Sequence, residues 1–225
     1  MRMILGRATL ILAALLAGAG GAGADSAAAQ EAEGFPQGLS EFSLSVGYAH
    51  LSLGSSSIFD SESALRIEPS LSLSPIQQVP QLRLGADVGV SMVLDNSTRT
   101  IISRNGQVLF AGTGDIPLWL LEPELRLSWR QPLGDQHQFF IEPGIAGGIA
   151  WGFLELTAED GSNETFEQDD STLFYRAFLR LGAHVPGGIA GIDISWLSGG
   201  HLDLGDNAAG DLNEFYIGIF GALLF

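Results

Sequence analysis

The stretch that decides the fold is Glu214-Phe215-Tyr216-Ile217-Gly218-Ile219-Phe220-Gly221-Ala222-Leu223-Leu224-Phe225. Side chains alternate between the two faces of a β-strand, so every second residue from Phe215 to Phe225 shares one face. That face carries Phe215, Ile217, Ile219, Gly221, Leu223 and Phe225 and is apolar throughout. The stretch therefore predicts a strand with one apolar face that ends on an aromatic residue.

Seven earlier segments alternate in the same way, and turn residues separate them. The clearest places Trp119, Leu125 and Trp129 on one face and Glu124 and Arg126 on the other. The eight segments cover residues 42–49, 65–73, 82–92, 119–130, 139–153, 173–185, 192–196 and 214–225. Period-2 patterning over the whole chain predicts an all-β fold.

The connections between these segments alternate in length. Short ones surround 75–80, 131–137 and 186–188, whereas long ones cover 54–61, 95–115, 156–171 and 198–211. Short turns at one end and long loops at the other are typical of an outer-membrane barrel. We therefore predict an eight-stranded antiparallel transmembrane up-and-down β-barrel over residues 41–225. Asn105-Gly106 predicts a hairpin inside the second long loop, because its arms are shorter than the about 9–11 residues of a spanning strand.

Composition and the N-terminus agree with an exported membrane protein. There is no cysteine and no lysine, so a disulfide framework and an ordinary soluble surface are both disfavoured. The net charge of -16 disfavours nucleic acid as a partner. Arg2 and Arg7 precede a short apolar run and small residues, which predicts a signal peptide over 1–29 and a periplasmic leader over 30–40. No other segment suits a membrane-spanning helix, so a membrane protein of this sequence must be a barrel.

A soluble barrel with its apolar face inward is the main alternative fold. We disfavour it because an eight-stranded interior is too narrow for all the large apolar residues of this face. Trp119 and Trp129 lie ten residues apart, and a tilted strand of that length rises about 25 Å, the height of the apolar band between aromatic girdles. The predicted girdle comprises Tyr48, Trp119, Trp129, Trp151, Tyr175 and Trp196.

These features together resemble the small eight-stranded bacterial outer-membrane barrels, such as the OmpA transmembrane domain and OmpX. The resemblance covers about residues 40–225 and rests on the architecture and on the strand that ends in Phe225. It implies a bacterial outer-membrane location, a monomer, outer-membrane lipids as partners, and Phe225 as the signal for the outer-membrane assembly machinery. It also implies that the peptidoglycan-binding domain of full OmpA-type proteins is missing.

The polar face predicts a charged lumen. The charged residues expected to point inward are Arg66, Glu68, Arg83, Asp87, Glu122, Glu124, Arg126, Arg130, Glu142, Arg176, Arg180, Asp193 and Glu214. Charges of both signs in a confined space should pair, because an unpaired buried charge is costly. We therefore interpret this set as a network that fills the lumen, and we prefer it to a selectivity lining for a narrow pore. Three inward aromatic residues, Phe140, Phe178 and Phe220, should help to close it. No cofactor and no metal site are predicted here.

The third and fourth long loops are acidic, and divalent cations are candidate ligands there, although a solvated loop explains the same charges. Their acidic residues are Glu159, Asp160, Glu164, Glu167, Asp169, Asp170, Asp203, Asp206 and Asp211.

Enzyme motifs are absent from the sequence, and the four histidines are scattered. One segment, Trp196-Leu197-Ser198-Gly199, resembles the His-x-Ser-Asn motif of eight-stranded lipid A deacylases, with Glu214 downstream. Trp196 stands where the base should be, so Ser198 would be a weak nucleophile unless His201 replaced the base.

We therefore predict a non-enzymatic barrel of structural, surface-binding or adhesive role. A lipid hydrolase and a narrow conduit for small apolar molecules are the alternatives.

Overall fold

The computed structural model describes residues 40–54, 56, 62–76, 78–93, 97–104, 107–115, 118–134, 138–157, 165–205 and 208–225. The predicted signal peptide and all but the last residue of the predicted leader lie outside these residues. The loop residues Glu159, Asp160, Glu164 and Asp206 also lie outside them. For β4, for β5 and for the ends of β8 and β9 at their connection, only the backbone is described. No helix in the described part of the chain is long and apolar enough to cross a membrane.

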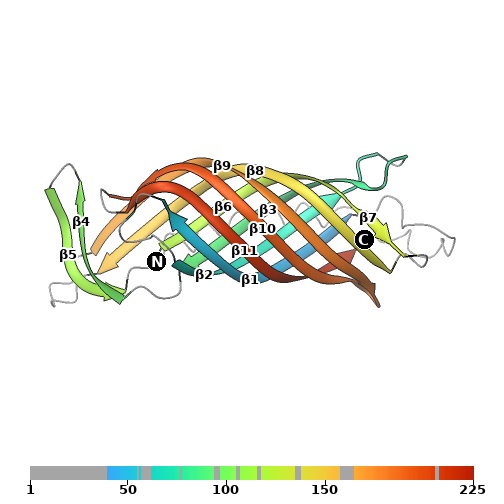
Figure 1. Cartoon of the computed structure of the whole chain (residues 1–225), viewed down its shortest axis with the longest axis horizontal. Coiled ribbons are helices and arrows are strands. Elements are labelled where there is room, and N and C mark those ends of the chain that lie inside the picture. Colours follow the sequence, from blue (N-terminus) through green and yellow to red (C-terminus); the bar gives the residue numbers. More distant parts are fainter. Residues whose placement is uncertain are drawn as a thin grey trace. The chain divides into compact units, whose positions relative to one another are not determined.

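Eight long antiparallel strands close into one barrel (Figure 1). They are β1 (Glu41–Leu53), β2 (Glu62–Leu73), β3 (Leu82–Val93), β6 (Leu118–Trp129), β8 (Phe139–Thr157), β9 (Thr165–Val185), β10 (Gly188–Asp203) and β11 (Ala209–Leu224). Each strand pairs with its neighbour in the chain, β6 pairs with β8, and β1 pairs with β11 to close the sheet. The predicted fold class is confirmed.

Three short strands and one tight turn lie in the connections between the long strands. β4 (Ser97–Arg104) and β5 (Gln107–Asp115) form a separate two-stranded sheet, which confirms the predicted hairpin in the second long connection. Its turn residues Asn105 and Gly106 lie outside the described residues. β7 (Gln131–Leu133) is a short strand in the connection between β6 and β8, and it pairs with the start of β8. Gly187, with φ +89°, lets the turn from β9 to β10 reverse in two residues.

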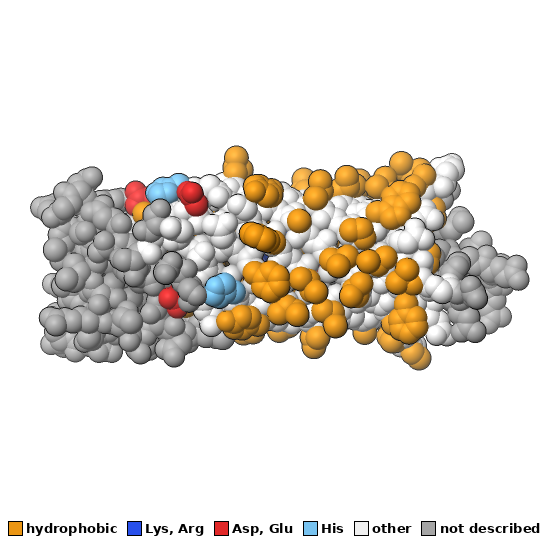
Figure 2. All heavy atoms as spheres, viewed as in Figure 1, with side chains coloured by type: hydrophobic (Ala, Val, Ile, Leu, Met, Phe, Trp, Pro, Cys, Tyr) orange, Lys and Arg blue, Asp and Glu red, His pale blue; other side chains and the backbone are white. Residues whose placement is uncertain are grey.

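The outer surface is an apolar belt. Leu125, Leu173 and Ile219 are 72%, 72% and 71% exposed, and hydrophobic side chains cover much of the visible face in Figure 2. Histidine and acidic side chains lie beyond one edge of this belt. A continuous apolar surface of this kind would be unfavourable in water but is what a lipid bilayer requires. The observed orientation of the two faces therefore contradicts the soluble-barrel alternative.

Two of the predicted loops are largely strand. β8 continues to Thr157 and β9 begins at Thr165, so the loop predicted over 156–171 is much shorter. β10 continues to Asp203 and β11 begins at Ala209, which shortens the loop predicted over 198–211. Glu167, Asp169 and Asp170 therefore lie on β9. The wall extends past the apolar belt, and its outward residues become polar there.

Candidate functional site in the barrel lumen

The strand alternation turns all thirteen predicted charged side chains away from the lipid face. Each is at most 6% exposed. On β6, for example, Glu122, Glu124, Arg126 and Ser128 are buried, while Leu125 and Leu127 between them are exposed. Glycines on the same inward face make room for the long side chains. A Cβ atom on Gly89 would collide with the guanidinium of Arg66, and one on Gly85 would collide with Arg126.

A central group of ion pairs surrounds Arg66 and Arg176. Arg66 Nη1 contacts Glu122 Oε2 and lies 3.0 Å from Glu214 Oε1, and Arg66 Nη2 lies 2.7 Å from Glu68 Oε2. Arg176 donates to Glu122 Oε2 over 2.7 Å and to Glu124 Oε2 over 2.9 Å. These contacts join β2, β6, β9 and β11, so the group crosses the lumen instead of following one pair of strands.

Two further arginines complete this central group. Arg180 Nε donates to Asp193 Oδ2 over 2.7 Å, between register partners on β9 and β10. Arg180 Nη2 also lies 3.5 Å from Glu68 Oε1. Arg126 Nη1 donates to Asp87 Oδ2 over 3.1 Å. The central group is therefore Arg66, Arg126, Arg176, Arg180, Glu68, Asp87, Glu122, Glu124, Asp193 and Glu214.

A second group lies at the end of the barrel where β1 begins. Arg130 donates to Glu41 Oε2 over 2.7 Å and to Glu142 Oε2 over 2.6 Å, and Arg83 Nη2 donates to Glu41 Oε2 over 3.0 Å. Ser128 donates to Glu142 Oε1 over 2.7 Å. Glu41 was not among the charges predicted to line the lumen. The signal was present, because Glu41 shares a face with Ser43 and Ser45, but it precedes the first apolar residue of the strand.

Aromatic rings stack against the guanidinium groups and fill the remaining width. The Arg130 guanidinium lies 4.3 Å from the centroid of Phe140, and that of Arg180 lies 5.1 Å from the centroid of Phe220. Phe178 lies between Arg126 and Arg180, at 5.8 and 5.9 Å. These are cation–π distances. Phe140, Phe178 and Phe220, which the sequence predicted to be inward, are all buried.

An apolar plug closes the lumen beyond the charges, at the end that carries the long connections. Each of its residues is at most 7% exposed. They come from every strand of the barrel wall except β2 and from the connection between β10 and β11. They are Leu51, Leu53, Val93, Leu118, Leu120, Ala150, Leu154, Phe174, Leu197, Leu202, Leu204, Ala208 and Leu212. A Cβ atom on Gly152 would lie 3.3 Å from Leu204 Cδ1, so this glycine gives the plug its space. The alternation thus inverts here, with apolar residues inside and polar residues outside.

The predicted girdle residues lie on the outer face. Tyr48, Trp129, Tyr175 and Trp196 are exposed, while Trp119 and Trp151 are half-buried. Phe225 is also exposed, and its backbone exchanges two hydrogen bonds with Ser40 at 2.9 and 3.0 Å. Its role as an assembly signal stays a prediction.

The structure separates the serine and the acidic residue that the hydrolase alternative requires. Ser198 is half-buried and pairs with Asn213, on the outward face of β10 and β11. Glu214 points to the lumen, where Arg66 and Ser91 bind its two oxygens. His201 lies 3.5 Å from Asp211 on the exposed surface. Ser198 and Glu214 therefore lie on opposite sides of the barrel wall.

Solved structures of similar fold include small bacterial outer-membrane barrels. Neisserial surface protein A has a TM-score of 0.53 and 7% identity, covering 83% of this chain and 97% of that one. Ail of Yersinia pestis has a TM-score of 0.48, 10% identity and coverages of 83% and 99%. The N-terminal β-barrel domain of Pseudomonas aeruginosa OprF has a TM-score of 0.42, 10% identity and coverages of 84% and 100%.

No protein-family model and no curated protein sequence matches the chain significantly. The fold is that of the small outer-membrane barrels, and the predicted location in a bacterial outer membrane agrees with it.

Proposed function

We propose that the protein is a monomeric, non-conducting outer-membrane barrel whose role is structural and surface-binding. The observation that supports this proposal is closure of the lumen at two levels. The charge network and its aromatic rings occupy the membrane-spanning part, and the apolar plug occupies the outer part. A small barrel interior is only wide enough for side chains to fill. Any recognition would then take place on the projecting outer end.

The absence of cysteine from the chain allows a direct test of closure. Ser195 is 4% exposed in the lumen, whereas Ser171 is exposed on β9. In folded barrels, a charged methanethiosulfonate reagent should modify Ser171→Cys rapidly and should leave Ser195→Cys unmodified until the protein is unfolded. Similar rates for the two variants would show an open lumen and would contradict the proposal.

The projecting end is acidic, which favours cationic partners. Glu167, Asp169 and Asp211 are exposed there. Vesicles that carry the barrel should bind an oligolysine peptide, and binding should weaken as salt rises because the charges are exposed. The variant Glu167→Gln/Asp169→Asn/Asp211→Asn should lose most of this binding. Equal binding by both proteins would show that the acidic end is not the binding surface.

One observation favours a narrow apolar conduit as the second candidate. The pairing of β9 with β10 stops at Phe174 and Gly199, although β9 continues along β8 to Thr165 and β10 continues along β11 to Asp203. The backbone N–H of Asp203 donates to Asp170 Oδ2 across this break, over 2.7 Å. Phe174, Leu197 and Leu202 of the plug lie behind it. Separation of the two strands would connect the plug with the outside.

A disulfide across the break tests the conduit. A Cβ atom on Gly200 would lie 3.9 Å from the Cβ atom of Thr172, which suits a disulfide. The conduit predicts that oxidised Thr172→Cys/Gly200→Cys transfers an apolar fluorophore into vesicles more slowly than wild type, and that a reductant restores the rate. If neither the wild type nor the variant transferred the fluorophore faster than protein-free vesicles do, the conduit would be rejected.

A further inference from the structure

The buried charges of the lumen do not balance. Among the described residues, the buried carboxylates outnumber the buried guanidiniums by two. The carboxylates are those of Glu41, Glu68, Asp87, Glu122, Glu124, Glu142, Asp193 and Glu214, and the guanidiniums are those of Arg66, Arg83, Arg126, Arg130, Arg176 and Arg180. Uncompensated charge in a closed interior is costly. Positive charge that the side chains do not supply must therefore enter the lumen.

The ion pairs show where the excess lies. Glu41 and Glu142 balance Arg83 and Arg130 in the group near the start of β1. In the described part of the chain, no ion pair within 4.0 Å joins these four residues to the central group. The excess of two negative charges therefore belongs to the central group.

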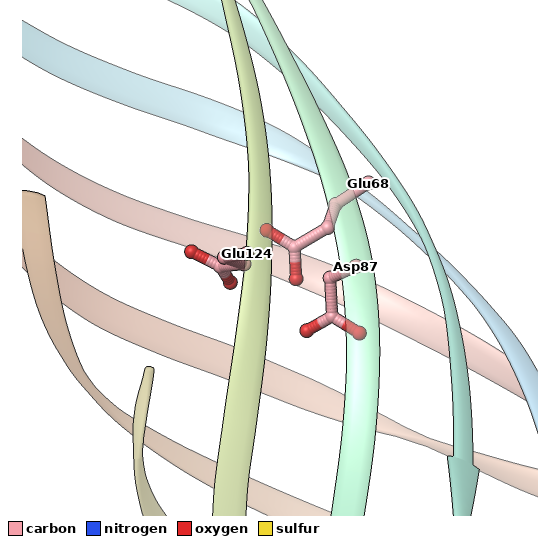
Figure 3. A group of neighbouring side chains, drawn as sticks. All are labelled: Glu68, Asp87 and Glu124. Carbon is pink, nitrogen blue, oxygen red and sulfur yellow. The ribbon is translucent and has the colours of Figure 1, made fainter. Parts of the chain in front are cut away.

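Three carboxyl groups of the central group converge on one point. Glu68, Asp87 and Glu124 come from the neighbouring strands β2, β3 and β6, and one oxygen from each lies within 4.8 Å of the others (Figure 3). Asp87 and Glu124 are register partners across β3 and β6. Like charges directly opposite each other on one face destabilise a pair of strands. In the three residues, here called the carboxylate trio, a cation would offset the repulsion between like charges.

An oxygen of the trio is without a partner. Asp87 is 3% exposed, and its Oδ2 accepts from Arg126, but its Oδ1 has no hydrogen-bond partner among the described residues. Glu68 Oε2 and Glu124 Oε2 likewise accept from Arg66 and Arg176. The other oxygen of Glu68, Oε1, lies 3.5 Å from Arg180 Nη2. A buried oxygen that accepts nothing is costly, and this position would be stabilised by a ligand.

We propose that the carboxylate trio binds a divalent hard cation, with Ca²⁺ as the best fit. Oxygen atoms about 2.3–2.6 Å from a shared Ca²⁺ lie at most about 5 Å apart, which the separation within the trio satisfies. A charge of +2 also cancels the excess of the central group. Ca²⁺ tolerates irregular geometry, whereas Mg²⁺ requires a near-ideal octahedron. The ion stabilises the closed barrel and enters during folding, because the apolar plug covers the trio on the outer side.

The test is refolding of the whole barrel with Ca²⁺ or with EDTA, followed by dialysis against EDTA and measurement of calcium by elemental mass spectrometry. Wild type refolded with Ca²⁺ should retain stoichiometric calcium and unfold at a higher temperature than wild type refolded with EDTA. Asp87→Asn and Glu124→Gln should lose the calcium. Without the metal, Glu124→Gln should fold as well as wild type, because it removes one of the like charges and Arg176 keeps its ion pair with Glu122. Loss of calcium in this variant would therefore not merely report misfolding.

The control variant is Glu167→Gln/Asp169→Asn/Asp211→Asn, which removes exposed carboxylates of the outer end and should retain the calcium. If the trio variants retained calcium and this control lost it, the ion would lie outside the lumen and the proposal would be wrong. Absence of calcium from the wild type, with the same unfolding temperature in Ca²⁺ and in EDTA, would also overturn it. In that case protons compensate the charge, and the unfolding temperature in EDTA should rise as the pH falls.

Discussion

Arg130 Nη1 donates a hydrogen bond to Glu41 Oε2 over 2.7 Å. The bond joins the start of β1 to the end of β6, and β2 and β3 lie between these two strands in the wall. Glu41 begins β1, and Arg130 follows the last residue of β6. The same carboxylate accepts from Arg83 of β3 over 3.0 Å. A single side chain at the start of the first strand therefore holds two guanidiniums from across the lumen, in a place where all three residues are buried.

We expect Glu41→Ala to lower the free energy of unfolding by about 3 to 5 kcal/mol, because it leaves Arg83 and Arg130 as buried charges with one fewer partner. Glu167→Ala is the control, since it removes an exposed carboxylate and should change stability by less than about 0.5 kcal/mol. Urea unfolding of the protein in lipid vesicles, followed by tryptophan fluorescence, measures both. Equal unfolding midpoints would contradict a stabilising role for the network.

Close packing of glycine against the network leads to a second prediction. A Cβ atom on Gly89 would meet the Arg66 guanidinium, whereas one on Gly221 would approach nothing closer than Ile189 O at 3.9 Å. We expect Gly89→Ala to destabilise the barrel by roughly 1 to 3 kcal/mol through overpacking, and Gly221→Ala to be neutral or stabilising. If Gly89→Ala unfolded at the same urea concentration as wild type, Arg66 would not be held where the ion pairs place it.

The lipid-facing side of the wall supplies a third prediction. Leu125 is 72% exposed between Trp119 and Trp129 on β6. Leu125→Arg should cost about 2 to 4 kcal/mol in a bilayer. Ser171→Arg, next to the girdle residue Trp151 at the edge of the apolar belt, should cost about 1 kcal/mol or less. Unfolding in vesicles measures the two values. A harmless Leu125→Arg would indicate water at this surface, as in a soluble barrel.

The membrane-spanning part of the fold could be predicted because one rule applies along all eight strands there. Leu125 outward and Glu124 inward follow directly from alternation across an apolar belt. The rule reverses beyond the belt, where Leu202 and Leu204 pack inside and Glu167 and Asp169 face water. Acidic strand residues were therefore predicted to be loop, and the apolar plug was missed.

The partners within the network could not be predicted from the sequence. Arg66 on β2 reaches Glu122 on β6 and Glu214 on β11, neither of which is on a neighbouring strand. Such contacts depend on the stagger of the strands and on the width of the lumen, which alternation does not specify. Glu41 was missed for a different reason, since a single charged residue before an apolar run does not distinguish the first strand position from a loop.

Planar-bilayer recording of the purified, refolded protein shows whether side chains close the lumen. We expect no stable porin-sized conductance steps, because the charge network and the apolar plug both block the path of ions. A Leu120→Asp/Leu154→Asp variant places charge in the plug alone. It should also show no stable conductance steps, because the charge network is intact. Stable porin-sized steps from the wild-type protein would show that the lumen is open to ions.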